Sequence, residues 1–211
     1  CYAIVPDSNS VENWPQGPAT YADSAIVMDM NSGAVLYSKQ IEKKHYPASI
    51  TKLLTTLVAL DNAELTDTVE FSQDSISFLE YGDAHIGMTP GEQISMEDAL
   101  YAVLLASANE VSYAVAESVG KKMGGGYDTF IQAMNDESGK LGCTGSHWTN
   151  ANGLHDEQHY TTAHDMARIG AAVYQKEAFR TISQSLSHTI PVTNLVNEER
   201  TFQQKHKMLW P

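Results

Sequence analysis

Ser49 and Lys52 are the residues of this chain whose types and spacing most directly suggest chemistry. They lie three positions apart at the start of an apolar run that ends at Leu60, and residues at i and i+3 of a helix are surface neighbours. A serine hydroxyl is a weak nucleophile at neutral pH and needs a base within hydrogen-bond reach. A lysine supplies that base once burial and the positive end of a helix dipole have lowered its pKa. The pair is therefore typical of a serine acylase whose base is a lysine.

The Ser-x-x-Lys pattern alone is weak evidence. A chain of this length contains roughly one such match by chance, and a second match runs from Ser118 to Lys121 beside a glycine-rich turn. Ser49 also fits a plain helix cap, with Lys52 as a solvated neighbour. We take Ser118–Lys121 as a chance match and look for further polar residues that could join Ser49.

A second polar element, Ser107-Ala108-Asn109, interrupts an apolar stretch between two expected helices. Its hydroxyl can relay a proton, and its carboxamide can both donate and accept hydrogen bonds. Taken alone, these residues describe an ordinary helix junction. Together with Ser49 and Lys52 they form the Ser-x-x-Lys and Ser-x-Asn pair of penicillin-binding proteins and class A β-lactamases, whose third element is Lys-Thr-Gly.

The surrounding sequence resembles the serine D-alanyl-D-alanine carboxypeptidases, low-molecular-mass penicillin-binding proteins of the β-lactamase/transpeptidase-like superfamily. The resemblance begins at about Tyr21 and continues to the last residues. It rests on these segments, in the order the family has them: Tyr37, Tyr46–Lys52, Leu104–Glu110, Phe130–Asn135, Leu141–Cys143, Asn152–Leu154 and His159–Ala167. It implies an α/β (α+β) fold, in which a helical subdomain accompanies an antiparallel sheet flanked by helices.

The resemblance also implies a mechanism for these residues. Ser49 attacks the carbonyl between the two terminal D-alanines of a peptidoglycan stem peptide, and Lys52 takes its proton. Ser107 passes a proton towards the departing D-alanine, while Asn109 holds the substrate amide and helps to position Lys52. The backbone N–H of Ser49 forms half of an oxyanion hole. Water then hydrolyses the acyl-enzyme, and β-lactam antibiotics acylate Ser49 by the same step.

The third family element is absent, because no lysine of this sequence is followed by Thr-Gly. The closing segment Gln203–Pro211 resembles the sequence just before that element, so we expect a chain truncated there. The sheet is then incomplete and the chain mainly helical, with a few strands. The missing part would supply the cation for the substrate carboxylate, so activity of these residues alone is not implied. Unpaired strand edges would favour self-association.

Three other interpretations compete with this one. A class A-like β-lactamase needs a glutamate that activates the deacylating water, and residues 142–160 offer Glu157 outside that family's pattern. A catalytically inert, penicillin-binding-like scaffold module is left open by the missing third element. A zinc site at His155–His159, which imitates His-Glu-x-x-His, is disfavoured because these residues fall in an expected loop instead of a helix. No metal or cofactor is therefore expected.

Composition limits the partners and the location. The formal net charge of -13 argues against nucleic acid and against anionic lipid. No stretch approaches the roughly 20 apolar residues of a membrane span. No signal peptide is recognised, and Cys1 is either a lipid-bearing first residue or simply where the sequence starts, which we favour. The resemblance implies an extracytoplasmic protein of the bacterial cell envelope, membrane-associated or secreted. Cys1 and Cys143 permit at most one disulfide, and Cys143 is expected to pack as a small hydrophobe.

Residues 1–20 lack periodicity and are expected to form a tail or linker before a single domain, 21–211, whose helical part covers about 49–160. Apolar periodicity and turn signals predict the remaining elements. They are a hairpin over 24–29 and 34–38, helices over 49–60, 99–106, 110–119, 127–141 and 162–175, an irregular stretch over 142–160, and strands after Thr181.

Overall fold

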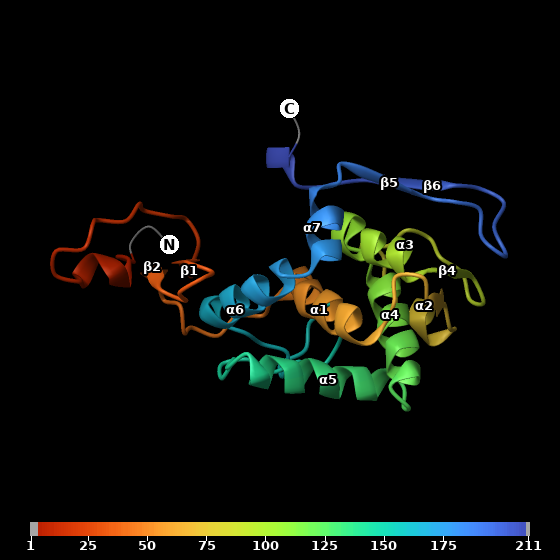
Figure 1. Ribbon diagram of the computed structural model, residues 1–211, viewed down its shortest axis with the longest axis horizontal. Helices are drawn as coiled ribbons and strands as arrows, with labels where there is room; N and C mark the ends of the chain where they lie inside the picture. Colours follow the sequence, from red (N-terminus) through yellow and green to blue (C-terminus); the bar gives the residue numbers. More distant parts are fainter. Residues whose placement is uncertain (1–3, 210–211) are drawn as a thin grey trace.

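A computed structural model describes residues 4–209, so the question of Cys1 lies outside the described residues. Figure 1 shows a central group of helices with one strand hairpin near the N-terminus and another near the C-terminus. The helices are α1 Lys52–Asn62, α2 Asp74–Ser77, α3 Met96–Tyr101, α4 Asn109–Lys122, α5 Tyr127–Lys140, α6 Ala163–Tyr174 and α7 Glu177–Gln184. The strands are β1 Ala25–Met28, β2 Val35–Lys39, β3 Thr68–Glu70, β4 Gln93–Ser95, β5 Ser187–Ile190 and β6 Arg200–Gln203.

Helix α1 lies at the centre of the helical part, in contact with α4, α5 and α6 (Figure 1). Leu54, Leu57, Val58 and Ala59 are all at most 2% exposed. Burying a leucine or valine side chain contributes about 1.5–3 kcal/mol, so this helix contributes strongly to the stability of the core. The helix predicted over 49–60 is thus a central, buried one, and the packed core fixes the position of its first residue, Lys52.

Two helices begin at residues whose side chains cap them. Ser95 Oγ accepts a hydrogen bond from Asp98 N at 3.1 Å and begins α3, and Thr162 Oγ1 accepts one from Asp165 N at 3.1 Å and begins α6. Such caps satisfy backbone donors that lack a partner within the helix. Helix α3 continues into a π-helical segment, Ala102–Ala106, which ends at Ser107 with φ +60°. The predicted break at this point is confirmed.

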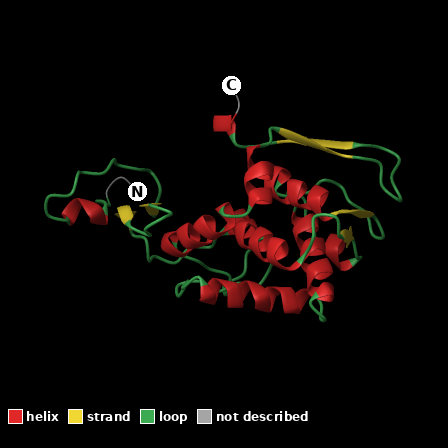
Figure 2. Ribbon diagram, in the orientation of Figure 1, coloured by secondary structure: helices red, strands yellow, loops and turns green. Residues whose placement is uncertain are grey.

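Within the described residues, the strands form three separate two-stranded antiparallel sheets, β1–β2, β3–β4 and β5–β6 (Figure 2). The mainly helical architecture with a few strands agrees with the sequence. The β3–β4 pair and the short helices α2 and α7 were not predicted, because segments of three to eight residues carry too little periodicity to be recognised. Cys143 is buried and forms no disulfide among the described residues, in keeping with its expected packing role.

Residues 4–20 contain a 3₁₀ turn, Asp7–Ser10, and contact β2 through three hydrogen bonds. Trp14 Nε1 donates to the carbonyl of Leu36 at 2.9 Å, and the hydroxyl of Tyr37 donates to the carbonyl of Pro18 at 2.9 Å. This stretch is therefore attached to the hairpin, and its separation from the domain as a tail stays a prediction. Within residues 4–209, no helix combines the length and apolar character needed to cross a membrane.

Candidate active site

Ser49 lies in a 3₁₀ turn, Ala48–Thr51, directly before α1, and Lys52 is the first residue of the α-helix. The sequence placed Ser49 on the first turn of the helix, and the structure differs only in the tightness of that turn. Ala48 has φ +49°, a left-handed conformation that costs an alanine free energy and turns the chain sharply before Ser49. Ser49 is exposed while Lys52 is only 3% exposed, so the hydroxyl faces solvent and the amine lies beneath it.

Lys52 Nζ has three oxygen neighbours. It lies 2.8 Å from Oδ1 of Asn109, 2.6 Å from the carbonyl oxygen of Asn152 and 3.3 Å from Oγ of Ser49. The first two oxygens only accept hydrogen bonds, so they take two N–H groups of the lysine. When the amine is neutral it has no third N–H, and its lone pair points at the remaining neighbour, Ser49 Oγ. The geometry therefore directs a neutral Lys52 to accept the proton of the serine hydroxyl.

Burial lowers the pKa of Lys52 from 10.5 to about 7, because the low-dielectric surroundings disfavour the charged form. The charge of Glu110 opposes this shift, that of Lys205 reinforces it, and that of Asp83 opposes it. A large share of the lysine is consequently uncharged near neutral pH. That is the protonation state a general base requires.

Two segments distant in the sequence bring the oxygen neighbours to Lys52. Asn109 is the first residue of α4, and its backbone N–H donates to the carbonyl of Ala84 at 2.8 Å. Asn152 precedes Gly153, whose φ of +87° favours glycine. A Cβ at Gly153 would lie 1.9 Å from the carbonyl oxygen of Ala48, so only glycine permits the loop to approach the serine turn this closely.

Ser107 lies at the end of the π-helical segment and is half-buried. Its φ of +60° is left-handed, which is uncommon for a residue with a Cβ. Its Oγ forms no hydrogen bond with any residue in the range 4–209. The structure thus places Ser49 and Asn109 each beside the amine of Lys52, and it puts Ser107 at the end of the π-helical segment, with no side-chain hydrogen bond to any of the three.

Thr51, inside the Ser49–Lys52 turn, contacts the buried imidazole of His159. Thr51 Oγ1 lies 2.8 Å from Nε2 of His159, and the backbone N–H of Thr149 donates to Nδ1 at 3.0 Å. Because the backbone N–H can only donate, Nδ1 is unprotonated and Nε2 carries the hydrogen that is donated to Thr51. Burial lowers the pKa of His159 to about 4, so this ring is neutral at physiological pH. It fixes the loop 142–160 against the serine turn.

Ser49 opens into a cavity of about 390 Å³. The residues that line it are Tyr46, Ala48, Ser49, Gly82, Asp83, Ala84, Asn109, Asn152, Gly153, Leu154 and His155. A larger cavity of about 570 Å³ is lined by Asp23, Ser24 and His45 among others and shares Tyr46 with the first, but contains none of the four predicted site residues. We take the smaller cavity as the candidate active site, because it holds the serine.

The rival interpretations gain no support from this geometry. Glu157 is exposed and does not line the cavity of Ser49. Both ring nitrogens of His159 are engaged by protein groups, and the ring of His155 packs edge-on against Tyr46 at 4.6 Å between centroids. Across residues 4–209, no group of three or more His, Cys, Asp or Glu side chains is arranged to hold a metal ion.

Sequence reasoning did not single out Asn152 or the Thr51–His159 pair as parts of the site. Asn152 acts through its backbone carbonyl, which every residue possesses, so no side-chain pattern marks it. The available signals were Asn152-Gly153-Leu154 and His159 within the family-like segments, and the length of the irregular stretch 142–160.

The fold is that of the penicillin-binding DD-peptidases. The chain superposes on the Streptomyces K15 DD-transpeptidase with a TM-score of 0.81 at 21% identity, covering 93% of this chain and 78% of that one. It superposes on a D-alanyl-D-alanine carboxypeptidase from Mycobacterium tuberculosis H37Rv with a TM-score of 0.79 at 30% identity, covering 99% and 74%.

Sequence comparison gives the family. The family model described as "D-alanyl-D-alanine carboxypeptidase" matches residues 11–211, so the chain belongs to that family. It is 32% identical to D-alanyl-D-alanine carboxypeptidase DacF of Bacillus subtilis over 74% of this chain and 40% of the relative. It is 28% identical to DacC of Escherichia coli over 99% of this chain and 52% of the relative, and 31% identical to DacB2 of Mycobacterium tuberculosis over 90% and 63%. The chain thus spans between 40% and 63% of the lengths of these relatives.

Proposed function

We propose that this chain carries the acylating site of a serine-type D-alanyl-D-alanine carboxypeptidase, with Ser49 as the nucleophile and Lys52 as its general base. The supporting observation is a buried amine, with a pKa of about 7, that lies 3.3 Å from an exposed serine hydroxyl. The substrate is a peptidoglycan stem peptide ending in D-Ala-D-Ala. Family membership supports this substrate, and the cavity beside Ser49 offers space for a peptide terminus.

In the proposed reaction, Ser49 Oγ bonds to the carbonyl carbon between the two D-alanines and its proton passes to Lys52 Nζ. The C–N bond then breaks, and the D-alanine amine takes up a proton by way of Ser107, whose hydroxyl has no competing partner among the described residues. Asn109 Oδ1 holds Lys52, while its Nδ2 forms no hydrogen bond within that part of the chain and is available to the substrate. Water finally hydrolyses the ester on Ser49.

The same acylation step accounts for proposed inhibition by β-lactam antibiotics. A β-lactam carbonyl would acylate Ser49 and leave slowly. Because peptidoglycan lies outside the cytoplasmic membrane, the proposal also places the protein in the bacterial cell envelope, either membrane-associated or secreted. The proposed steps use only groups of the protein, the substrate and water.

Fluorescent penicillin and a synthetic peptide ending in D-Ala-D-Ala test this proposal together. The complete gene product is expected to become labelled and to release D-alanine, and its Ser49→Ala variant is expected to do neither. Ser118→Ala, which alters the second Ser-x-x-Lys match, is the matched control and should behave as wild type. Absence of labelling in the folded complete gene product would favour an inert scaffold module. Nitrocefin turnover as fast as peptide turnover would favour a β-lactamase.

A further inference from the structure

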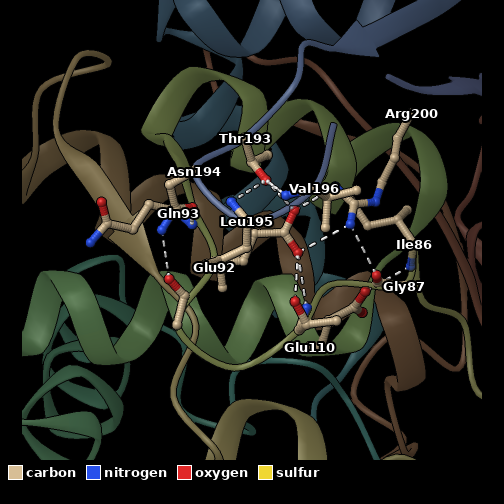
Figure 3. Close-up of polar contacts among 12 residues, drawn as sticks. Ile86, Gly87, Glu92, Gln93, Glu110, Thr193, Asn194, Leu195, Val196 and Arg200 are labelled. Atoms are coloured by element: carbon tan, nitrogen blue, oxygen red, sulfur yellow. Dashed lines mark hydrogen bonds and ion pairs between the residues drawn. The ribbon is translucent and has the colours of Figure 1, made fainter. Parts of the chain in front are cut away.

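Glu110 is a fully buried carboxylate, 0% exposed, in the first turn of α4. Its Oε1 accepts a hydrogen bond from the backbone N–H of Ile86 at 2.7 Å, and its Oε2 has no partner within residues 4–209 (Figure 3). No lysine, arginine or histidine in that range forms an ion pair with it. A buried carboxylate without a counter-ion is costly, so packing alone does not explain this residue.

The surroundings of Glu110 partly offset the cost of burying its negative charge. Burial raises the pKa of Glu110 above its ordinary value, but the backbone N–H groups of Ile86, Glu110 and Val111 act in the opposite direction. Two of these N–H groups belong to the start of α4, where the helix dipole also favours an anion. The charge of His85 acts in the same direction.

Glu110 follows Asn109, the residue whose Oδ1 lies 2.8 Å from Lys52 Nζ. Its charge is the strongest of the nearby charges acting on Lys52 and favours the protonated amine. Asp83 of the cavity wall acts in the same direction and Lys205, after β6, in the opposite one. The loop 142–160 also contacts Lys52, through the backbone carbonyl of Asn152, which carries no charge.

The segment 86–87, which binds the Glu110 carboxylate, forms hydrogen bonds with two different side chains. Ile86 N is bound by Glu110, and the carbonyl of the next residue, Gly87, accepts a hydrogen bond from Arg200 at 3.2 Å (Figure 3). Arg200 in turn forms a bidentate ion pair with the buried Glu92, with 2.6 Å between Nη1 and Oε1 and 3.1 Å between Nη2 and Oε2. The carboxylate of Glu110 is therefore held in one place relative to α4 and the cavity wall.

We propose that Glu110 is a positioning residue that acts through Lys52: its fixed carboxylate tunes how readily the amine takes up and gives back a proton. The inference rests on the proposed function, in which Lys52 is the general base. As Ser49 Oγ bonds to the carbonyl carbon, its proton moves to Lys52 and an ammonium forms in a buried site. The carboxylate of Glu110 stabilises that ammonium until the C–N bond breaks and the proton leaves with the amine.

Glu110→Gln tests the charge while keeping an oxygen that can accept from Ile86 N. Without the negative charge Lys52 loses its proton at lower pH. The rate of Ser49 acylation by fluorescent penicillin falls at low pH, and we call this part of the pH–rate profile the acid limb. In Glu110→Gln, the midpoint of the acid limb should lie about one pH unit lower than in wild type. Glu117→Gln removes a charge from the same helix at a residue that accepts from Ser72 Oγ, and it should keep the wild-type profile. An acid limb of Glu110→Gln that coincides with the wild-type limb would overturn the proposal.

A second variant distinguishes a loss of charge from a disturbance of folding. A second measurement tests the coupling between Glu110 and Lys52 independently of the proposed function. Glu110→Asp keeps the charge and should retain an acid limb close to wild type, and a shift as large as that of the Gln variant would count against a role for charge. NMR titration of ¹³Cε-lysine-labelled full chain follows Lys52 without any reaction. A lower Lys52 midpoint in Glu110→Gln supports the coupling even where penicillin labels no variant, an outcome that would remove only the proposed function. Equal midpoints would refute the coupling.

Discussion

Lys52 Nζ donates a hydrogen bond to the carbonyl oxygen of Asn152 at 2.6 Å, across 100 positions of sequence. Together with Asn109 Oδ1, this carbonyl takes two of the amine's hydrogens and leaves Ser49 Oγ as the third neighbour. The lysine is thereby oriented before any substrate binds. Pre-organisation of this kind lowers the free energy needed to align the reacting groups.

Lys52→Arg tests the need for a neutral base. A guanidinium offers the same oxygens several N–H donors, but it does not lose its proton in proteins. We expect the second-order rate of acylation by fluorescent penicillin to fall by about 10²–10⁴-fold, the usual contribution of general base catalysis. A thermal unfolding curve checks that the variant is folded. An Arg variant that acylates within tenfold of wild type would remove Lys52 from the proton transfer.

The pH dependence of acylation follows from the lowered pKa of Lys52. Below about pH 7 the amine is charged and has no lone pair to accept the proton of Ser49, so the rate should fall about tenfold per pH unit. Above about pH 7 the rate should level off. Stopped-flow labelling from pH 5 to pH 9 measures this limb. An acylation rate that keeps rising up to about pH 9 would instead indicate that Lys52 titrates in the ordinary range of lysine. Burial would then not lower the pKa of Lys52 in solution.

The sequence predicts the local part of this site better than the long-range part. Ser49 and Lys52 come together because residues three positions apart are neighbours on a helical turn. The amine is buried because the helix that follows is apolar. Asn109 was expected through a polar break between two apolar helices. The contact with Asn152 depends on how the loop 142–160 returns to the serine turn, and no periodic pattern encodes that return. The burial of Glu110 likewise follows from tertiary packing, since a glutamate in a first helical turn is usually exposed.

Gly153→Ala is expected to displace the serine turn. The added Cβ would lie 1.9 Å from the carbonyl oxygen of Ala48, and the φ of +87° is also strained for alanine. Gly124→Ala separates the two effects, because Gly124 has φ +90° with no atom within 4 Å of the added Cβ. We expect about 1 kcal/mol of lost stability for Gly124→Ala and roughly 2–4 kcal/mol for Gly153→Ala, measured by chemical denaturation. Acylation of Ser49 should fall only in the Gly153 variant, and equal effects of both changes would contradict the steric argument.

His159 should make the protein sensitive to acid. Its pKa is about 4 in the folded protein, against about 6.5 in an unfolded chain, so the unfolded state binds more protons between these values. The stability that the neutral ring contributes is therefore complete above about pH 6.5 and is lost as the pH falls towards 4. Between pH 7 and pH 5 the loss amounts to about 2 kcal/mol in the free energy of unfolding. Denaturant titrations of wild type and His159→Gln at both pH values should show this difference in wild type and not in the variant. His206→Gln, which changes an exposed histidine, should retain the wild-type loss, and a His159→Gln variant with the same acid loss would show that another group causes it.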